Sequence, residues 1–265
     1  MSYVAEYRNE TSEHSPALWL RSWRRAAPAA ARVVMFPHAG GGASFYRGWS
    51  EEFPASVDLR VVQYPGREDR LNDRFAPSLG VLADSLAAVL ANLPAAPLLL
   101  FGHSMGALLA YEVALRLERR GAPALRHLFV SGRRPPGCRP GGSVHRRDDA
   151  GLMAELAALG GTPSALQQQP ELRALVLPAV RDDYRLVETH PSRAGTALAC
   201  ALSACNGEAD ADAADMDGWA AHTSGPSALH LFPGDHFYLQ AQRRRLVELM
   251  LACLPGVGPP APPAP

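Results

Sequence analysis

Residues 97–106 read Pro-Leu-Leu-Leu-Phe-Gly-His-Ser-Met-Gly, and a helix-like stretch follows them from Ala107 to Arg120. This pattern predicts a strand, a tight turn and a helix, with Ser104 at the bend. A G-x-S-x-G turn holds its serine in a strained, exposed backbone position, and its glycines let strand and helix approach each other. The pentapeptide alone is short enough to arise by chance. The flanking elements and the correctly ordered partners downstream favour a nucleophile at Ser104.

Short apolar strands alternate with segments of helical periodicity along the rest of the chain. We expect a strand beginning at Leu18, further strands over residues 32–36, 58–64, 97–101, 127–131, 196–205 and 228–232, and helices over 79–93, 107–120 and 238–253. This alternation predicts an α/β fold with a mostly parallel central sheet and helices on both faces. A length of 265 residues suits one large α/β domain, or a core with an inserted subdomain.

The alternation breaks between about residues 133 and 195, where helical patterns replace strands. Leu152–Leu159 and Glu171–Thr189 have helical spacing, and Pro178 should kink or split the second helix. A helical insertion placed after the nucleophile predicts a lid over the active site, although a helical excursion that only covers the sheet has the same pattern. We expect a flexible N-terminus over residues 1–16 and a disordered Pro-rich tail over 255–265.

A serine hydroxyl needs a histidine as its base and a carboxylate that orients the imidazole. In this architecture the chain order is serine, acid, histidine, with the partners on loops after later strands. His236 follows the strand at 228–232 and precedes the final helix, so we predict that it is the base. Asp210 follows the strand that ends at Cys205 and is the preferred acid. Asp212 could substitute for it if the register slips.

The oxyanion that forms during acyl transfer needs preorganised N–H donors. The backbone of Met105, directly after the nucleophile, should supply one. Ala39, in the loop Pro37-His38-Ala39-Gly40-Gly41-Gly42 after an early strand, is the best candidate for the other. The loop resembles a phosphate cradle only weakly, because it lacks G-x-G-x-x-G spacing and an acidic residue placed for a ribose.

Composition excludes several other classes of function. The formal net charge of zero argues against a dedicated nucleic-acid binder. All 26 basic residues are arginine, which excludes Schiff-base, pyridoxal-phosphate and P-loop lysine chemistry. The four cysteines have no C-x-x-C spacing, so we expect no metal site or disulfide framework, and a reducing cytoplasm fits best. No apolar run reaches membrane length, and residues 1–16 lack the apolar core of a signal peptide.

Several short motifs, spread from about residue 18 to residue 250, belong together. They are Phe36-Pro37-His38-Ala39-Gly40-Gly41, Gln63-Tyr64-Pro65-Gly66-Arg67, Gly102-His103-Ser104-Met105-Gly106, Leu159-Gly160-Gly161-Thr162-Pro163, Leu177-Pro178 with Arg181-Asp182-Asp183-Tyr184, and Phe232-Pro233-Gly234-Asp235-His236-Phe237. On these motifs the chain resembles the stand-alone type II thioesterases that accompany polyketide synthases and nonribosomal peptide synthetases. The serine motif occurs in many hydrolases, but the combination is much more specific. One departure is Ala211, because the family usually has proline after the acid.

The resemblance implies an α/β-hydrolase fold over residues 17–254 and hydrolysis of acyl thioesters held on the phosphopantetheine arm of carrier proteins. In such families the enzyme removes aberrant or stalled acyl groups through a serine acyl-enzyme. By position, Ser104 is the nucleophile, Asp210 and His236 complete the triad, and Ala39 and Met105 donate to the oxyanion. The expected partners are carrier-protein domains. We expect a monomer that needs no cofactor.

Two further features bear on the substrate and its carrier. The apolar residues of the insertion would receive the acyl chain, although a core role is equally open for any one of them; they are Leu152, Leu156, Leu159, Leu172, Leu175, Leu177 and Val180. Arginines near the start of the insertion could meet an acidic carrier surface, or could simply lie in a solvated loop; they are Arg133, Arg134, Arg139, Arg146 and Arg147.

Two other functions compete with editing hydrolysis. One is release of a fatty-acyl or polyketide chain, or its transfer to another acceptor, which the same residues would allow because water and other acceptors compete for one acyl-enzyme. The other is a catalytically silent module that binds carrier proteins. An intact set of serine, aspartate and histidine argues against the silent module.

Overall fold

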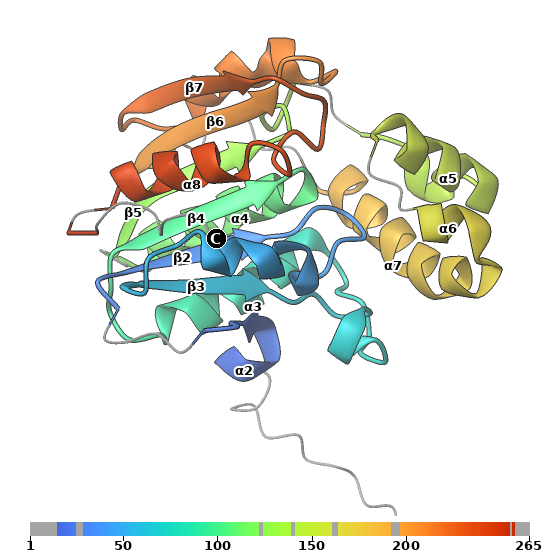
Figure 1. The fold of residues 1–265 in the computed structure, drawn as a ribbon, viewed down its shortest axis with the longest axis horizontal. Helices are drawn as coiled ribbons and strands as arrows, with labels where there is room; N and C mark the ends of the chain where they lie inside the picture. Colours follow the sequence, from blue (N-terminus) through green and yellow to red (C-terminus); the bar gives the residue numbers. More distant parts are fainter. Residues whose placement is uncertain are drawn as a thin grey trace, which may run out of the picture.

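The computed structural model describes residues 15–24, 29–121, 124–138, 141–160, 164–191, 197–254 and 256–257. Within these ranges seven strands form one sheet in the order β1-β3-β2-β4-β5-β6-β7 (Figure 1). The strands are β1 (Leu20–Arg21), β2 (Ala31–Phe36), β3 (Val57–Val62), β4 (Leu98–His103), β5 (Leu125–Ser131), β6 (Ala201–Gly207) and β7 (Ser227–Phe232). Only β1 pairs antiparallel with its neighbour, and the other pairs are parallel. The predicted α/β fold with a mostly parallel sheet is confirmed.

Helices cover both faces of this sheet. The helices α3 (Leu79–Ala91) and α4 (Met105–Arg119) pack on one face, and α8 (Arg243–Ala252) packs on the other beside the 3₁₀ helix η1 (Ala43–Glu51) (Figure 1). Every residue of β2 and of β4 is buried. Strands covered on both faces need apolar side chains on both sides, which explains their continuous rather than alternating hydrophobicity.

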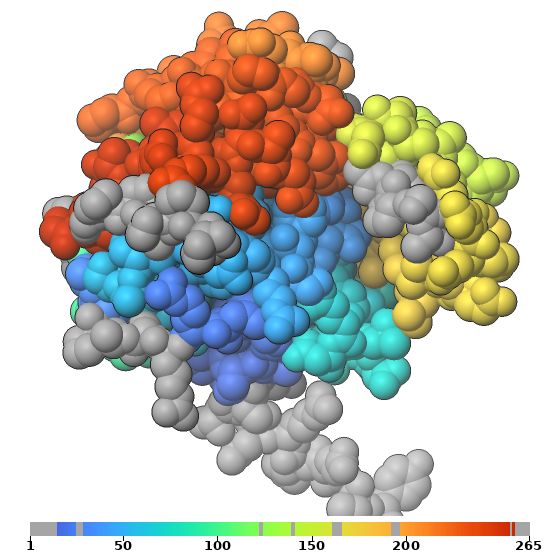
Figure 2. Space-filling model, viewed as in Figure 1, coloured from blue at the N-terminus to red at the C-terminus, as the bar shows by residue number. Residues whose placement is uncertain are grey.

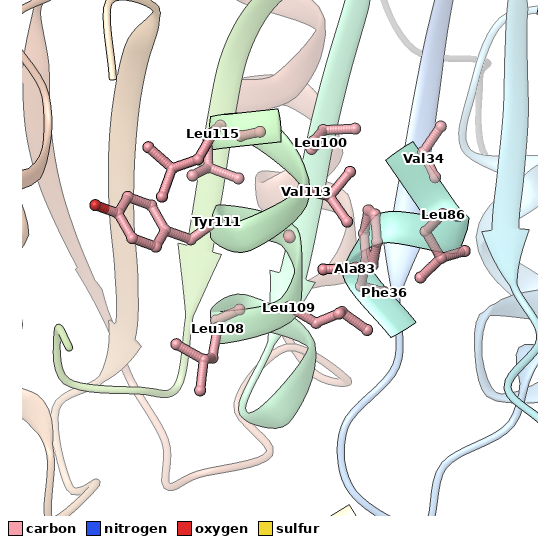
Figure 3. Close-up of a cluster of buried hydrophobic side chains, with 14 of the residues drawn as sticks. Val34, Phe36, Ala83, Leu86, Leu100, Leu108, Leu109, Tyr111, Val113 and Leu115 are labelled. Carbon is pink, nitrogen blue, oxygen red and sulfur yellow. The ribbon is translucent and has the colours of Figure 1, made fainter. Parts of the chain in front are cut away.

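The α3–α4 face has a dense core. Figure 3 shows Ala83 and Leu86 of α3 and Leu109 and Val113 of α4 gathered with the strand residues Val34, Phe36 and Leu100. Their strand neighbours Val33 and Met35 belong to the second core, on the α8 face. Successive strand residues point to opposite faces. The two cores therefore hold β2 and β4 rigidly between them.

Helices fill the segment between β5 and β6, where the sequence predicts an insertion. They are η3 (Val144–Arg146), α5 (Asp149–Ala158), α6 (Ser164–Gln168) and α7 (Pro170–Glu188). Figures 1 and 2 show α5, α6 and α7 as a lobe at one side of the sheet. Val144, Leu152, Leu177 and Val180 form a small core of their own within this lobe. We call α5, α6 and α7 the insertion helices.

The strand expected over 196–205 runs from Ala201 to Gly207, and three other elements also differ from the sequence prediction. Leu18 and Trp19 belong to the helical turn α2 (Pro16–Trp19), which begins with a proline at its first position, so the strand starts only at Leu20. The final helix starts at Arg243 rather than near residue 238, because Tyr238 and Leu239 are buried in a turn before it.

The third difference is α7, which remains one helix although Pro178 lies inside it. Proline removes one backbone hydrogen bond and usually bends or ends a helix. Here Pro178 is exposed, whereas Leu177 and Val180 beside it are buried. Packing of these two side chains holds the two halves of α7 together, so the helix is not split.

Some predictions concern residues that the structure does not describe. The predicted flexible N-terminus and Pro-rich tail lie almost wholly outside the described ranges, as do residues 192–196 near the end of the insertion. Among the described helices, none combines the length and the apolar character needed to span a bilayer.

Candidate active site

Ser104 lies in the gap between β4, which ends at His103, and α4, which begins at Met105. Its φ of 56° and ψ of −117° are strained for a residue other than glycine. The crowding around the turn explains why its flanks are glycine. A Cβ on Gly102 would lie 2.1 Å from the carbonyl oxygen of Gly106, and a Cβ on Gly106 would lie 2.0 Å from the carbonyl oxygen of Phe36. The turn therefore has the geometry that the motif predicts.

His236 and Asp210 lie side by side although 26 residues separate them. Asp210 follows β6, His236 follows β7, and the two strands are parallel neighbours, so the loops after them meet at one edge of the sheet. His236 Nδ1 is 2.6 Å from Asp210 Oδ2. The carboxylate accepts this bond, so Nδ1 carries the proton and Nε2 is left as the basic nitrogen.

The environment of Asp210 favours its charged form. Burial alone would raise the pKa of Asp210, but the hydrogen bond from His236, the bond from the Asp212 amide and the nearby positive charges outweigh it and lower the pKa. The backbone N–H of Asp212 donates to Asp210 Oδ1 over 2.9 Å. Asp210 thus remains an anion that can hold the imidazole in one orientation.

Two other aspartates and a second histidine near the site have other partners. Asp212 forms an ion pair with Arg134, with 2.5 Å between Oδ1 and Nη1. Asp235 is exposed, and its Oδ1 accepts the backbone N–H of Phe237. His103 is buried and its Nδ1 lies 2.9 Å from the hydroxyl of Ser131. Of the acids weighed from the sequence, Asp210 is the one that the structure places against His236.

Ser104 and His236 line the same cavity. Among the described residues no hydrogen bond joins the serine hydroxyl to the ring of His236. The structure thus brings Ser104 and His236 to one cavity, with Asp210 bonded to His236, but the serine–histidine contact of a triad is not formed.

The two predicted oxyanion donors lie on neighbouring segments. Met105 is the first residue of α4, so its N–H has no acceptor within the helix. Ala39 lies in a tight turn, in which the N–H of Gly41 donates to the carbonyl oxygen of His38 over 3.0 Å and Gly40 has a φ of +75°. The close approach of Gly106 to Phe36 and Pro37 places this turn beside the start of α4.

An ion pair that the sequence analysis did not assign holds this turn. Arg67 follows β3, Asp183 lies on α7, and both are at least nine-tenths buried. Arg67 donates to Asp183 through Nη1 (2.6 Å) and Nη2 (2.8 Å), and Asp183 Oδ2 also accepts the N–H of Gly40 over 2.7 Å. Burial works to lower the pKa of Arg67, but the charge of Asp183 and its hydrogen bonds raise it. Both residues stand within the motifs quoted above, and that was the available signal.

The cavity has a volume of about 800 Å³. Ala39, Ser104 and His236 lie on its catalytic side. The insertion helices and the loop after α5 supply an apolar wall, which consists of Leu156, Leu159, Leu166, Leu172, Leu175, Val176, Val180 and Tyr184. Five of the seven predicted apolar residues therefore line the cavity. Leu152 and Leu177 do not, because both are buried in the core of the insertion lobe.

The predicted arginine cluster is partly engaged within the protein. Arg134 pairs with Asp212, and Arg147 pairs with Glu155. Burial lowers the pKa of Arg133 to about 10. Arg139 lies outside the described residues. A role of these arginines toward a carrier protein remains a prediction.

Comparison with known proteins gives consistent matches. A family model described as the thioesterase domain matches residues 31–254. The probable cadicidin biosynthesis thioesterase of Streptomyces griseus is 42% identical over 231 residues, which is 86% of this chain and 64% of that protein, so the chain spans less than two thirds of its length. Thioesterase PikA5 of Streptomyces venezuelae is 42% identical over 230 residues, covering 85% of this chain and 81% of PikA5. BorB, a type II thioesterase from the borrelidin biosynthetic cluster, has a solved structure that matches with a TM-score of 0.82 and 39% identity over 89% of this chain and 98% of BorB.

Proposed function

The chain belongs to the thioesterase domain family and has the α/β-hydrolase fold, and from this premise we propose that it is a type II thioesterase of a polyketide or nonribosomal peptide pathway. It hydrolyses acyl thioesters on the phosphopantetheine arm of carrier proteins and removes aberrant or stalled acyl groups. One observation carries the proposal: Ser104 and His236 line one cavity with an apolar wall, and Asp210 binds His236. A nucleophile, a base and an acyl-binding surface are what thioester hydrolysis requires.

The proposed reaction has two halves. His236 Nε2 takes the proton of the Ser104 hydroxyl as Oγ bonds to the thioester carbonyl carbon. The C–S bond then breaks, and the departing thiol takes the proton from His236. In the second half His236 takes a proton from water, whose oxygen bonds to the acyl carbon. The bond from that carbon to Ser104 Oγ then breaks, His236 returns the proton to Oγ, and the free acid leaves. The serine–histidine hydrogen bond would form when substrate binds, because catalytic hydrogen bonds often tighten only in the substrate complex.

The backbone supplies the electrostatic part of the mechanism. The amides of Met105 and Ala39 are proposed to donate to the oxygen that becomes negative when Oγ attacks. The start of α4 adds the positive end of a helix dipole at the same place. Asp210 stabilises the imidazolium that forms on His236. These groups complete the reaction without a cofactor or a metal ion.

The acyl group is proposed to lie against the insertion helices, which would then act as a lid. Leu156, Leu172 and Leu175 offer hydrocarbon surface to an alkyl chain, and burial of apolar area stabilises such a complex. The carrier protein would remain outside, with its arm reaching Ser104.

A panel of matched esters tests this function. The purified protein is offered the same acyl group on a carrier protein, on N-acetylcysteamine and on an oxygen alcohol. We expect thioesters to be cleaved faster than the oxygen ester, a further increase with the carrier protein, and a free acid as product. An ester product would indicate transfer to another acceptor. Binding of acyl carrier proteins without cleavage would instead indicate the silent module.

A further inference from the structure

We propose that Asp183 on α7 is a positioning residue, which holds the turn of residues 38–41 in the shape that the Ala39 amide needs. This proposal rests on the proposed function, because it concerns the oxyanion donors of that reaction. It links the insertion helices to the oxyanion donors through one side chain, because Asp183 holds a loop of the sheet domain.

The contacts place Asp183 directly on this turn. Asp183 Oδ2 accepts the N–H of Gly40 at 2.7 Å and Arg67 Nη1 at 2.6 Å. The same Nη1 donates to the carbonyl oxygen of Gly41 at 3.1 Å. One ion pair therefore binds the turn through a backbone N–H and through a backbone carbonyl.

The turn of residues 38–41 has a defined backbone conformation. Gly41 N–H donates to His38 O, and Gly40 has a positive φ at the third position, as a type II turn requires. The bond from Gly40 N–H to Asp183 fixes the orientation of the Ala39–Gly40 peptide. The His38–Ala39 peptide, which carries the N–H of Ala39, shares the Ala39 Cα with it, so a shift of the Ala39–Gly40 peptide would displace that donor.

Packing reinforces the charge contact. Val180 lies one turn before Asp183 on the same face of α7. A Cβ added to Gly40 would lie 2.6 Å from Val180 Cγ2, so the helix touches the turn closely. Displacing α7 would break both contacts at once, and the Ala39 amide would lose its support.

A purely structural role for this pair is the competing explanation. Buried ion pairs often contribute little net stability compared with apolar residues of similar volume, whereas removing only one partner is strongly destabilising. Stability and positioning are therefore separable. A variant that removes both charges should recover stability but still lack the acceptor for Gly40.

The chain offers a matched control for this test. Asp182 is the adjacent acid on α7, and it pairs with Arg185 rather than with the turn, at 2.7 Å. Asp182→Ala removes the same carboxylate one position away. Three variants are compared with the wild type: Asp183→Ala, Asp182→Ala, and the double variant Arg67→Met with Asp183→Leu.

Steady-state kinetics on a short acyl-N-acetylcysteamine thioester and thermal melting are the first readouts. We expect Asp183→Ala to lower kcat about 10- to 100-fold with KM within about twofold, because misplacing an oxyanion donor affects the transition state more than the bound substrate. Asp182→Ala should stay within about twofold of wild type. The double variant should melt above Asp183→Ala, yet keep the low kcat. Wild-type kcat in a folded double variant would overturn the proposal.

Hydrogen exchange of the backbone amides in residues 37–42 gives a readout that does not need activity. Exchange at Gly40 should be at least about 10-fold faster in Asp183→Ala and in the double variant, because both lack the acceptor of its N–H, and unchanged in Asp182→Ala. If the wild type cleaves no thioester, the proposed function fails while this measurement still decides the role of Asp183. Unchanged exchange in the double variant would overturn that role.

Discussion

At the scale of single residues, the strained backbone of Ser104 depends on the absence of side chains at its flanks. Gly106→Ala should destabilise the protein by about 3 kcal/mol, because the new Cβ would lie 2.0 Å from a backbone oxygen that cannot move aside easily. Gly80→Ala in α3 is the control, since its Cβ would meet only side-chain atoms at 3.6 Å and beyond. Urea unfolding of both variants measures the difference. Equal stabilities of the two variants would show that the turn around Ser104 is not tightly packed.

Asp210 and Asp212 provide a sharp comparison at the same scale. Asp210→Asn should lower kcat by about 10³- to 10⁴-fold, because the imidazole loses the anion that fixes its tautomer and stabilises its charged form. Asp212→Asn removes only the partner of Arg134 and should change kcat by a few-fold at most. The measurement is kcat on one thioester for both variants. A larger loss in Asp212→Asn would make Asp212 the acid.

Sequence reasoning reached some site residues and missed others for a physical reason. Ser104, Asp210 and His236 each follow a strand of a parallel sheet, so their chain order predicts where they meet. Asp183 contacts Gly40 across 143 residues, and it lies on a helix outside the sheet. The motif that contains Asp183 marks the residue, but no local pattern says which segment it contacts, so that contact came from the structure.

At the scale of elements, the leucines of α7 differ in how far they are buried. Leu177 is 3% exposed and Leu175 is 49% exposed, with Leu175 facing the cavity. Leu177→Ala should lower the free energy of unfolding by about 2–4 kcal/mol, because it leaves a void in the core of the insertion lobe. Leu175→Ala should leave stability almost unchanged and raise KM for long acyl thioesters more than for short ones. Unfolding curves and KM values across chain lengths check both. A large loss of stability in Leu175→Ala together with a raised KM in Leu177→Ala would mean that Leu175 belongs to the core and Leu177 lines the cavity.

The same helix shows what periodicity can and cannot predict. Helical spacing located α7 and its apolar residues, but it did not distinguish those that line the cavity from those in the lobe core. That distinction depends on what packs against each face. Tertiary packing also explains why Pro178 does not split the helix and why Leu18 and Trp19 form a helical turn instead of a strand.

At the scale of the whole molecule, the parallel sheet explains why four distant segments share one site. Ala39 follows β2, Ser104 follows β4, Asp210 follows β6 and His236 follows β7. The carboxyl ends of parallel strands face one edge, where open α/β sheets bind their ligands. Alternation of strands and helices therefore predicted the fold, and the same edge of the sheet holds the proposed site.

Two neutral histidines, the buried His103 and the half-buried His38, make the stability of the whole protein sensitive to acid. Desolvation, together with the charge of His236, lowers the pKa of His38 to about 3 and that of His103 well below 6.5. Below pH 6.5 the unfolded chain binds protons that the native state does not, so the free energy of unfolding should fall as the pH drops from 6.5 toward 3. Urea unfolding between pH 7.5 and 5 checks this, because carboxylates titrate mostly below that window. His103→Gln should make the slope shallower. A stability that stays constant or rises toward pH 5 would contradict the burial of these rings.

The most direct test of the proposed acyl-enzyme mechanism is to locate the acyl group during turnover. The enzyme is mixed with an acyl thioester, quenched with acid within the first turnovers and digested with trypsin, and the peptide from Phe75 to Arg116 is sequenced by mass spectrometry. We predict that the acyl mass lies on Ser104. Ser104→Ala should show no adduct, and its kcat should be lower by about 10⁴-fold or more. An acyl group on another residue, or near-wild-type turnover by Ser104→Ala, would contradict the role of Ser104 as the nucleophile.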